Sequence, residues 1–505
     1  MGTGTKALLI GAALLPVMIV AVAFASWNAL TALGPSFEIP SGPAIDPPPS
    51  YLGAPASSRP IDAARVPQHP YMAPNGRSSI HSDAYMSDTN EWSGPLGRDP
   101  ETRSTFQVGE CATVTFDSEG RIVTLCVRPV GRFVAMIESD SLDRVATFDL
   151  PDRAGGLGAL LAGDALTDFT GGGYFYLDHR DRAVVPTTTR HVYVIAQTEE
   201  PGFELERDID LTAVISEDDG ITSVLPDWDG RLWFVTADGT VGTVPRGGAR
   251  AGGAIGLGED IENSFAVDEA GGVFVVSDEA MYRFDAGPGG APEVSWRRPY
   301  PNSGEQKPGQ SDDGSGTTPT LLGRRWVGIA DNAKRLGVVV YDRRREPAGR
   351  RIVCRRPVFE PGRGATENSL IAAGRSFLVE NNYGYAGPAS TLLAGTTEPG
   401  FARVDVDHDG RGCELVWESD VRAPSVVPKL SLATGLVYTY TKPAGATSAP
   451  WYLTALDFRT GRTAFEVQAG RGYNHNNHYA PVTLGPDGGA YVGALAGLIR
   501  VADGG

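Results

Sequence analysis

Several residue types and motifs on which enzyme classes depend are scarce or missing in this chain of 505 residues. It has four cysteines and no CxxC spacing, which argues against a metal-binding or catalytic role for cysteine. A G-x-S-x-G nucleophile elbow, an H-E-x-x-H zinc motif, a Walker loop and a dinucleotide fingerprint are all missing. Lys and Arg number 44 against 61 Asp and Glu, a net charge of −17, so we expect no nucleic-acid partner.

The chain also lacks a convincing long amphipathic helix after residue 75. Its apolar residues alternate with period two instead, as at Val273–Val276 and Val338–Tyr341. Turn signals such as Asp229-Gly230 separate these runs, and 64 glycines and 37 prolines suit many tight turns. The pattern predicts an all-β fold.

A repeat with an irregular step runs through the second half of the chain. Each copy is an apolar run, a glycine-containing turn and a second run rich in aromatic and β-branched residues, and the copies begin at Ile221, Glu262, Thr317, Glu367, Ser425 and His478. A step of roughly 40–60 residues is typical of a β-propeller blade. Residues 110–150 and 168–216 supply two further blades, so we predict eight blades, with seven as the alternative. The last copy shows three strands, and a strand near Arg103–Gly109 would close the ring.

The N-terminal part differs from the repeat. Ala7–Leu33 is almost wholly apolar, long enough to span a bilayer, so residues 1–34 form either a membrane anchor or a signal peptide cleaved near Ala25. Both alternatives export the rest of the chain, and the anchor would make the cell membrane a partner through residues 7–33. Prolines are dense from Pro35 to Pro74, which predicts an extended extracytoplasmic spacer over 35–100 before a propeller over 101–505.

An even number of cysteines in an exported chain indicates disulfides. Cys111 and Cys126 flank a predicted hairpin and are expected to pair. Cys354 and Cys413 then pair by elimination.

Two copies of the repeat begin with the same tripeptide, Glu-Asn-Ser. Residues before the innermost strand of each blade crowd around the channel of a propeller, so Glu262, Asn263, Glu367 and Asn368 are expected to converge. Carboxylate and amide oxygens suit Ca²⁺. The alternative is that these side chains cap the starts of the strands.

Two loops rich in amides and aromatic residues are candidate ligand sites. The residues proposed to bind a polar or sugar-like ligand are Glu380, Asn381, Asn382, Tyr383, Tyr385, Tyr473, Asn474, Asn476 and Asn477. His475 and His478 in the second loop are candidate general acid/base residues. An ordinary surface loop is the alternative for both segments.

Asp405, Asp407 and Asp409 match the start of a D-x-D-x-D-G calcium loop. The twelfth position holds Val416 instead of a glutamate, which excludes a standard EF-hand. A calcium-stabilised hairpin and a simple polar turn remain as the two interpretations.

Ala455–Gly461, with Phe465 after it, resembles the Ala-x-Asp-x-x-Thr-Gly repeat of quinoprotein-like (PQQ-repeat) propellers. The copy at Glu262 resembles, more weakly, the repeat of gluconolactonase/strictosidine synthase-like propellers. The first resemblance implies a propeller fold, although most docking tryptophans and the adjacent cysteine pair of several quinone enzymes are missing, which disfavours PQQ as a cofactor. The second implies a metal held at Asn263 and Asn368.

These observations favour an exported, membrane-anchored propeller that binds a polar small molecule, glycan or partner protein at its channel face. The alternative is a Ca²⁺-dependent hydrolase or lactonase, with the metal on the two Glu-Asn pairs and proton transfer by His475 or His478. A quinone-dependent dehydrogenase is the third candidate.

Overall fold

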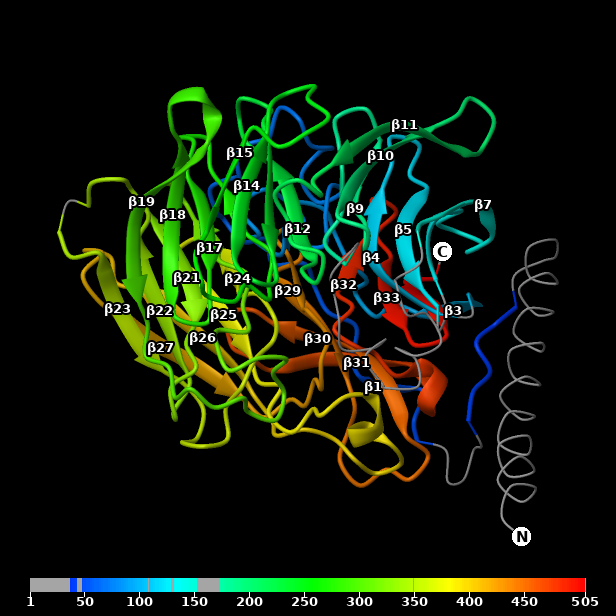
Figure 1. Cartoon of the computed structure of the whole chain (residues 1–505). Helices are drawn as coiled ribbons and strands as arrows, with labels where there is room; N and C mark the ends of the chain where they lie inside the picture. Colours follow the sequence, from blue (N-terminus) through cyan, green and yellow to red (C-terminus); the bar gives the residue numbers. More distant parts are fainter. Residues whose placement is uncertain are drawn as a thin grey trace, which may run out of the picture.

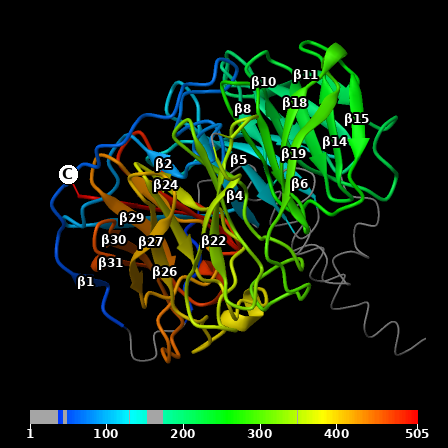
Figure 2. The same ribbon diagram turned by 90° about the vertical axis from the view of Figure 1, so that its left-hand side faces the viewer.

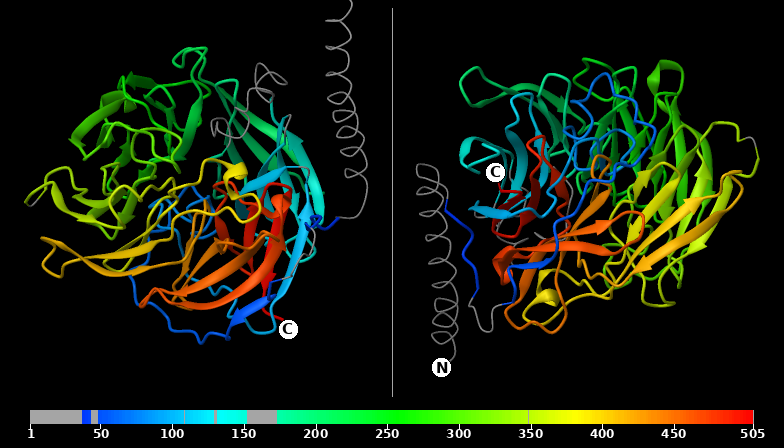
Figure 3. Two further views of the ribbon diagram at one scale, coloured as in Figure 1. Left: turned by 90° about the horizontal axis from the view of Figure 1, so that it is seen from below. Right: turned by 180° about the vertical axis from the view of Figure 1, so that it is seen from behind.

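The computed structural model describes residues 37–42, 48–107, 109–128, 131–151, 173–347 and 349–504. Within these ranges the regular structure is β-strand, apart from three 3-10 turns, η2 (Pro288–Gly290), η3 (Pro388–Thr391) and η4 (Tyr473–His475). The strands form eight sheets around a common axis (Figures 1 and 3). The chain is thus an all-β propeller of eight blades, as the repeat predicted, and the alternative of seven blades is wrong.

The first four blades each consist of four consecutive antiparallel strands. Blade 1 contains β4 (Glu110–Phe116), β5 (Ile122–Val127), β6 (Arg132–Ile137) and β7 (Arg144–Asp149), and blade 2 contains β8 (Tyr176–Leu177), β9 (Ala183–Pro186), β10 (His191–Gln197) and β11 (Phe203–Asp210). Blade 3 contains β12 (Ile221–Pro226), β13 (Leu232–Thr236), β14 (Thr240–Val244) and β15 (Gly253–Gly256), and blade 4 contains β16 (Ala266–Val267), β17 (Val273–Val276), β18 (Ala280–Ala286) and β19 (Pro292–Pro299).

Blades 5 to 7 continue this order around the axis. Blade 5 contains β20 (Thr320–Leu322), β21 (Trp326–Ala330), β22 (Gly337–Asp342) and β23 (Ile352–Pro357). Blade 6 contains β24 (Ile371–Ala373), β25 (Ser376–Glu380), β26 (Phe401–Val406) and β27 (Cys413–Ser419). Blade 7 contains β28 (Lys429–Ser431), β29 (Leu436–Thr441), β30 (Pro450–Asp457) and β31 (Thr463–Arg471).

The eighth sheet combines residues from both ends of the described chain. It contains β32 (Val482–Leu484), β33 (Ala490–Ala494), β34 (Gly497–Ala502) and β3 (Glu101–Phe106). Strand β3 runs antiparallel to β34, with Glu101 opposite Ala502 and Phe106 opposite Gly497.

Burial changes from the axis outward within a blade. The inner strands β20, β24, β28 and β32 are buried at every position, whereas the outer strands β7 and β27 alternate between half-buried and exposed side chains. Inner strands are covered on both faces by neighbouring blades, so they lack the strict apolar–polar alternation that marks a half-exposed strand.

Aspartate side chains close the first turn of several blades. In blade 3, Asp227 Oδ1 accepts hydrogen bonds from the amides of Asp229 (3.0 Å) and Arg231 (2.9 Å), and its Oδ2 accepts from Trp233 Nε1 (3.0 Å). Asp117 and Asp178 bond in the same way to amides two and four residues later. These Asp-Gly and related turns are therefore structural, because they satisfy backbone donors that the strands leave free.

The two predicted disulfides are confirmed. Cys111 and Cys126 face each other across β4 and β5 inside blade 1. Cys354 of β23 and Cys413 of β27 lie on the outermost strands of blades 5 and 6. The second bond therefore ties two neighbouring blades together at the rim.

The interpretation of residues 35–100 as a spacer needs correction. Strand β1 (Tyr51–Gly53) pairs antiparallel with β31 at the rim of blade 7, and β2 (Thr89–Asn90) pairs parallel with β28 at the inner edge of the same blade. Most residues from 69 to 90 are buried. We call residues 69–92 the plug and residues 54–66 the strap. The prolines that indicated an isolated spacer instead keep the chain extended along the propeller.

The plug is held by the inner strands. In the left panel of Figure 3 it lies in blue in the middle of the ring, and Figure 2 shows β2 beside β24. Amides of four successive inner strands donate to plug carbonyls, in the pairs Val267–Ala84 (3.0 Å), Leu321–Tyr85 (2.8 Å), Ala372–Ser87 (2.9 Å) and Leu430–Asp88 (3.0 Å). These bonds occupy inner-strand donors that would otherwise face the channel.

The predicted anchor or signal peptide over 1–34 lies outside the described residues. Within the described ranges, no helix has the length and apolar character needed to cross a bilayer.

Candidate functional site

A cavity of about 50 Å³ lies on the channel axis, beyond the tip of the plug. We call it the channel cavity. Blades 1 and 2 and five of the segments that lead into inner strands contribute to it, and its lining includes Tyr174, Glu262, Asn263, Thr318, Glu367, Asn368, Ser369, Val427, His478 and Tyr479. The plug contributes Ile80 and His81. Both Glu-Asn pairs and one of the two candidate histidines thus lie around one cavity.

Asn368 presents its carbonyl oxygen without a partner. Its amide nitrogen donates to Glu380 Oε1 (2.5 Å) and to the carbonyls of Val426 (2.9 Å) and Ser425 (3.2 Å). These three acceptors fix the orientation of the amide group. Asn368 Oδ1 is buried and has no hydrogen-bond partner among the described residues.

Glu367 adds a second unpartnered oxygen to the same cavity. Its Oε1 accepts a hydrogen bond from Ser311, whereas its Oε2 is buried and unpartnered within the described part of the chain. Burial raises the pKa of Glu367 well above its ordinary value, and the carboxylates of Asp312 and Glu262 raise it further. A buried acceptor without a partner costs about 1–3 kcal/mol, which a bound ligand or ion would recover.

Further carboxylates surround this side of the cavity. Burial, together with the nearby charges of Asp313, Asp278 and Asp260, raises the pKa of Asp312 to about 6. Asp260 and Asp278 also contact each other, with the Asp260 amide donating to Asp278 Oδ1 (3.0 Å). The field at Glu367 is therefore negative, and a cation would relieve it.

Aromatic and amide groups also line the cavity. Tyr174 donates from its hydroxyl to Asn263 Oδ1 at 3.0 Å. The Asn263 amide nitrogen is buried and finds no acceptor among the described residues. Among the described residues, the lining of the cavity therefore includes one donor without an acceptor, Asn263 Nδ2, besides the two acceptors without a donor.

His478 joins the cavity to the loop that follows β25. Tyr385 hydroxyl and His478 Nδ1 lie 2.9 Å apart, and the same hydroxyl donates to the Asn477 carbonyl at 3.0 Å. Glu110 Oε1 of blade 1 accepts a hydrogen bond from the His478 amide at 3.0 Å. The loop with His478 is thus fixed from two blades, which positions its imidazole at the cavity.

The other predicted ligand residues either bond to residues that line the channel cavity or lie away from it. Glu380 and Asn382 bond to each other at 2.6 Å and hold Asn368 and the Glu367 amide. In four other asparagines the side-chain amide nitrogen donates mainly to backbone carbonyls; these are Asn381, Asn474, Asn476 and Asn477. Tyr383 and Tyr473 do not line the channel cavity. For these residues the interpretation as loop-stabilising groups fits better than ligand binding.

His475 does not share the cavity with His478. Its ring packs against Gly470, where an added Cβ would come within 1.9 Å of it, and its Nδ1 lies 3.1 Å from the Arg471 carbonyl. Burial lowers the pKa of His475 to about 4. This histidine therefore fixes the turn at η4.

The predicted calcium hairpin at Asp405, Asp407 and Asp409 is not formed as a cage. Asp405 is buried and takes both its hydrogen bonds from the guanidinium of Arg403, at 2.8 and 2.9 Å. Asp409 caps the turn through the Arg411 amide. Among the described residues, no group of three or more His, Cys, Asp or Glu side chains is arranged to hold a metal ion.

No local sequence pattern indicated the ionic cluster that fixes the plug below the cavity. Asp88 forms a buried ion pair with Lys429 of β28, and its carboxylate also contacts His81 Nδ1 at 3.1 Å and accepts from Ser369. His81 Nε2 lies 3.3 Å from the Thr318 hydroxyl at the cavity. Burial raises the pKa of Asp88, but Lys429 and His81 together lower it below its ordinary value. Asp88 is therefore held as a carboxylate.

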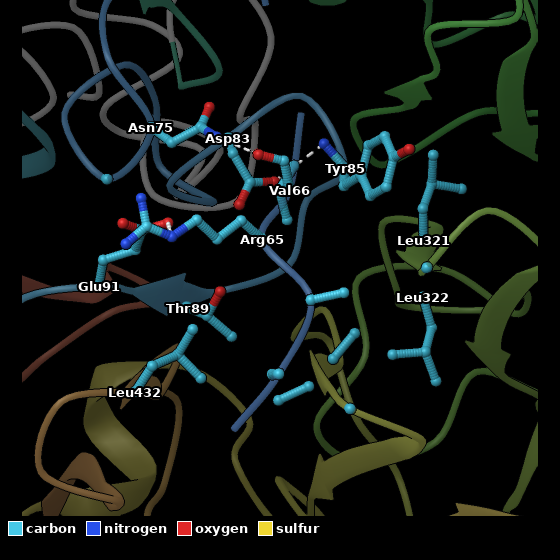
Figure 4. A pocket seen from close by; sticks show the side chains of 17 residues that line it. Arg65, Val66, Asn75, Asp83, Tyr85, Thr89, Glu91, Leu321, Leu322 and Leu432 are labelled. Carbon is cyan, nitrogen blue, oxygen red and sulfur yellow. Dashed lines mark hydrogen bonds and ion pairs between the residues drawn. The ribbon is translucent and has the colours of Figure 1, made fainter. Parts of the chain in front are cut away.

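A second pocket lies between the strap, the plug and the turns of blades 5 and 6, as Figure 4 shows. Arg65 and Glu91 form an exposed ion pair across it at 3.3 Å. The buried carboxylate of Asp83 accepts from the Tyr85 amide at 2.9 Å and from the hydroxyl of Ser87. The polar groups around this pocket already bond to one another, so their role is to hold the plug in place.

A pH-dependent stability is expected from the carboxyl group behind His478. Burial raises the pKa of Glu110 to about 8. Between its unfolded value, about 4.3, and about 8, the folded state keeps a proton that the unfolded state releases, so stability falls as pH rises through this window. Glu110→Gln should flatten the slope by up to roughly 1.4 kcal/mol per pH unit and stabilise the protein near pH 8.

Urea denaturation between about pH 5 and pH 9 measures this effect. Glu360→Gln, which changes an exposed carboxylate, is the matched control and should keep the parental slope. Asp83, Glu367 and Glu380 also have raised pKa values, so part of the slope remains in Glu110→Gln. Equal slopes in Glu110→Gln and the parent would contradict the prediction.

Comparisons with known proteins agree with this architecture. No family model matches the chain. An uncharacterized protein of Archaeoglobus fulgidus is 31% identical over 330 residues, which are 59% of this chain and 64% of that relative, so the match spans less than two thirds of its length.

Two solved structures share the fold at low sequence identity. A europium-containing methanol dehydrogenase superposes with a TM-score of 0.56 at 11% identity, covering 85% of this chain and 98% of that one. A quinohemoprotein alcohol dehydrogenase from Comamonas testosteroni gives 0.52 at 12% identity, covering 87% and 81%. The chain therefore has the eight-bladed fold of the quinoprotein-like β-propellers, as the repeat at Ala455–Gly461 indicated.

Proposed function

We propose that this protein is an exported propeller that binds a small, positively charged polar ligand in the channel cavity. The observation that carries the proposal is the pair of buried, unpartnered oxygens, Glu367 Oε2 and Asn368 Oδ1, at one cavity. Native proteins rarely leave two such acceptors together without a ligand, ion or water.

The charge of the ligand follows from the surroundings. Glu262 and Asp312 raise the pKa of Glu367, so adding a cation removes repulsion and adds a charge-assisted hydrogen bond or an ion–oxygen contact. Asn263 supplies a donor for a hydroxyl or carbonyl oxygen of the ligand. Two cations have this chemistry, a metal ion such as Ca²⁺ and the ammonium group of a small amine.

The size of the ligand follows from the cavity. About 50 Å³ holds a few water molecules, a cation with part of its hydration shell or a small head group. Typical pockets for drug-sized ligands are roughly 300–1,000 Å³. The channel as it stands does not fit a tricyclic quinone, so quinone-dependent redox chemistry is not part of the proposal.

Titration calorimetry with CaCl₂ and with methylammonium chloride tests the proposal. One of the two should bind with one site per chain, and Glu367→Gln should weaken it by about 10–100-fold, because a hydrogen bond to a charged group contributes about 1.5–3 kcal/mol. Glu360→Gln should bind as the parent does. Binding should tighten with rising pH and release protons, because burial and the neighbouring carboxylates raise the pKa of Glu367 and so favour its protonated form before the cation binds.

The two probes separate the possible ligands. Binding of Ca²⁺ alone assigns a metal site, and binding of methylammonium alone assigns an amine site. If neither probe binds the folded protein, or if Glu367→Gln binds like the parent, the proposal is wrong.

A Ca²⁺-dependent hydrolase or lactonase is the second candidate. The observation that favours it is the position of His478, which lines the same cavity and is held by Tyr385 at 2.9 Å. In that case a small lactone should be hydrolysed in the presence of Ca²⁺, and His478→Asn should abolish turnover while Ca²⁺ still binds.

Export is part of the proposal. Two disulfides in a chain with an apolar stretch at residues 7–33 favour an oxidising compartment outside the cytoplasm. Whether residues 7–33 anchor the chain in the cell membrane can be tested by extraction of the full-length protein with carbonate, which releases a secreted or peripheral protein and leaves an anchored one.

A further inference from the structure

A third pocket lies away from the channel cavity, between blades 2 and 3, on the face where their first turns lie. It has a volume of about 220 Å³. We call it the arginine pocket. The turn between β8 and β9, the turn between β14 and β15 and the first residues of the plug region form its walls, with Arg180, Arg246 and Tyr71 as the corresponding side chains.

The lining is strongly basic although the whole chain carries a charge of −17. His179 and four arginines line the pocket, at positions 180, 182, 207 and 246, against a single carboxylate, Asp178. The carboxylate of Asp178 is already engaged in hydrogen bonds, because it accepts from Arg182 Nε at 2.8 Å and from the backbone amides of Arg180 and Arg182. The pocket thus concentrates positive charge on an acidic protein.

The four arginines of the pocket differ in how far the protein uses their hydrogen-bond donors. Arg182 also pairs with Glu206, and Arg207 donates to the Gly248 carbonyl at 2.5 Å. By contrast, no hydrogen bond or ion pair within the described ranges engages the guanidinium groups of Arg180 and Arg246. Arg246 lies over the Tyr71 ring at 4.8 Å from its centroid, which orients it without using its N–H donors.

The floor of the pocket is apolar and aromatic. It consists of side chains from β9, β10, β13 and β14, with Tyr176 buried among them, and includes Val184, Val194, Leu232 and Val244. Tyr71 is fixed between Arg246 and His179, whose ring meets it edge to face at 5.8 Å. A cationic rim over an apolar floor matches a ligand with an anionic group on an apolar body.

We propose that the arginine pocket is a binding site for a small organic anion, such as an aromatic carboxylate or phosphate monoester. Arg180 and Arg246 hold the anionic group, because a guanidinium presents paired donors to carboxylate or phosphate oxygens. The apolar floor and the Tyr71 ring receive the body of the ligand. About 220 Å³ accommodates one ring with its charged group.

Calorimetry with four probes tests this site on the full chain. Benzoate and phenyl phosphate should bind with one site per chain, inorganic phosphate more weakly because it leaves the apolar floor empty, and benzyl alcohol not measurably. Arg180→Gln and Arg246→Gln should each weaken the binding of phenyl phosphate about tenfold, which corresponds to a loss of about 1.4 kcal/mol in binding free energy. Arg350→Gln, an exposed arginine between β22 and β23, should have no effect.

The variants should fold normally, because both arginines are exposed and surface substitutions change stability little; circular dichroism checks this. Glu367→Gln should leave anion binding unchanged, which separates this site from the channel cavity. Equal binding of benzyl alcohol and benzoate would overturn the proposal. So would phenyl phosphate binding that the double variant Arg180→Gln/Arg246→Gln retains, or the lack of binding by both aromatic anions in the millimolar range.

Discussion

Asp88→Ala is expected to lower the free energy of unfolding by about 3–5 kcal/mol, because it leaves Lys429 buried without a counter-charge. Both side chains are almost fully buried, with at most 1% exposure. Burial lowers the pKa of Lys429, and the carboxylate of Asp88 offsets part of that effect. His81 and Ser369 lose a partner in the same substitution.

A double variant separates charge from packing. In Asp88→Leu/Lys429→Met no unpaired charge remains, and replacing a buried ion pair by apolar groups is often neutral. We therefore expect most of the lost stability to return. Asp62→Ala, which removes an exposed carboxylate of the strap, should change stability by less than about 0.5 kcal/mol.

Urea denaturation measures the three variants, and limited proteolysis shows whether the plug is released. Cleavage within residues 69–92 should become faster in Asp88→Ala than in the parent. A loss below about 1 kcal/mol, with the plug still protected, would show that the backbone hydrogen bonds to Val267, Leu321 and Ala372 hold the plug without the ion pair.

Removing the disulfide between blades 5 and 6 is expected to have the second largest effect. The bond between Cys354 and Cys413 closes a loop of 59 residues. Loop-closure entropy gives about 4 kcal/mol for a loop of this length, so Cys354→Ser/Cys413→Ser should lose roughly that amount. The bond lies at the rim, where it limits the separation of two neighbouring blades in the unfolded chain.

The disulfide inside blade 1 provides the matched comparison. Cys111 and Cys126 are 15 residues apart, and their removal should cost about 3 kcal/mol by the same argument. Denaturation of both double variants, with and without reductant, measures the two effects. Equal midpoints for the parent under oxidising and reducing conditions would contradict both predictions.

The fold could be predicted from the sequence because its signals are local. A hairpin turn with Asp and Gly, such as Asp227–Gly230, and a period-two strand depend on residues close together in the chain. The repeat at a step of roughly 40–60 residues then indicated a propeller, and the pairing of Cys111 with Cys126 followed from a predicted hairpin. The Glu-Asn-Ser repeats likewise indicated which segments reach the channel.

The plug could not be predicted in this way. Residues 69–92 have no regular periodicity, since their burial comes from contacts with blades that lie between 40 and 392 residues later in the chain. The same holds for the charges of the arginine pocket, which come from separate turns of two blades. Asp88 and Lys429 are 341 residues apart, and nothing local to either residue indicates the other.

The sequence by itself determined the blades, their turns, the disulfide partners and the polar residues that lead into the inner strands, because short-range hydrogen bonding and side-chain alternation specify these features. Only the tertiary structure decided what the channel contains. The eight blades lie around a common axis, so their inner strands come together there, and the plug bonds to several of these strands. The remaining space is a small cavity where Glu367 and Asn368 each keep an oxygen that has no hydrogen-bond partner within the described part of the chain.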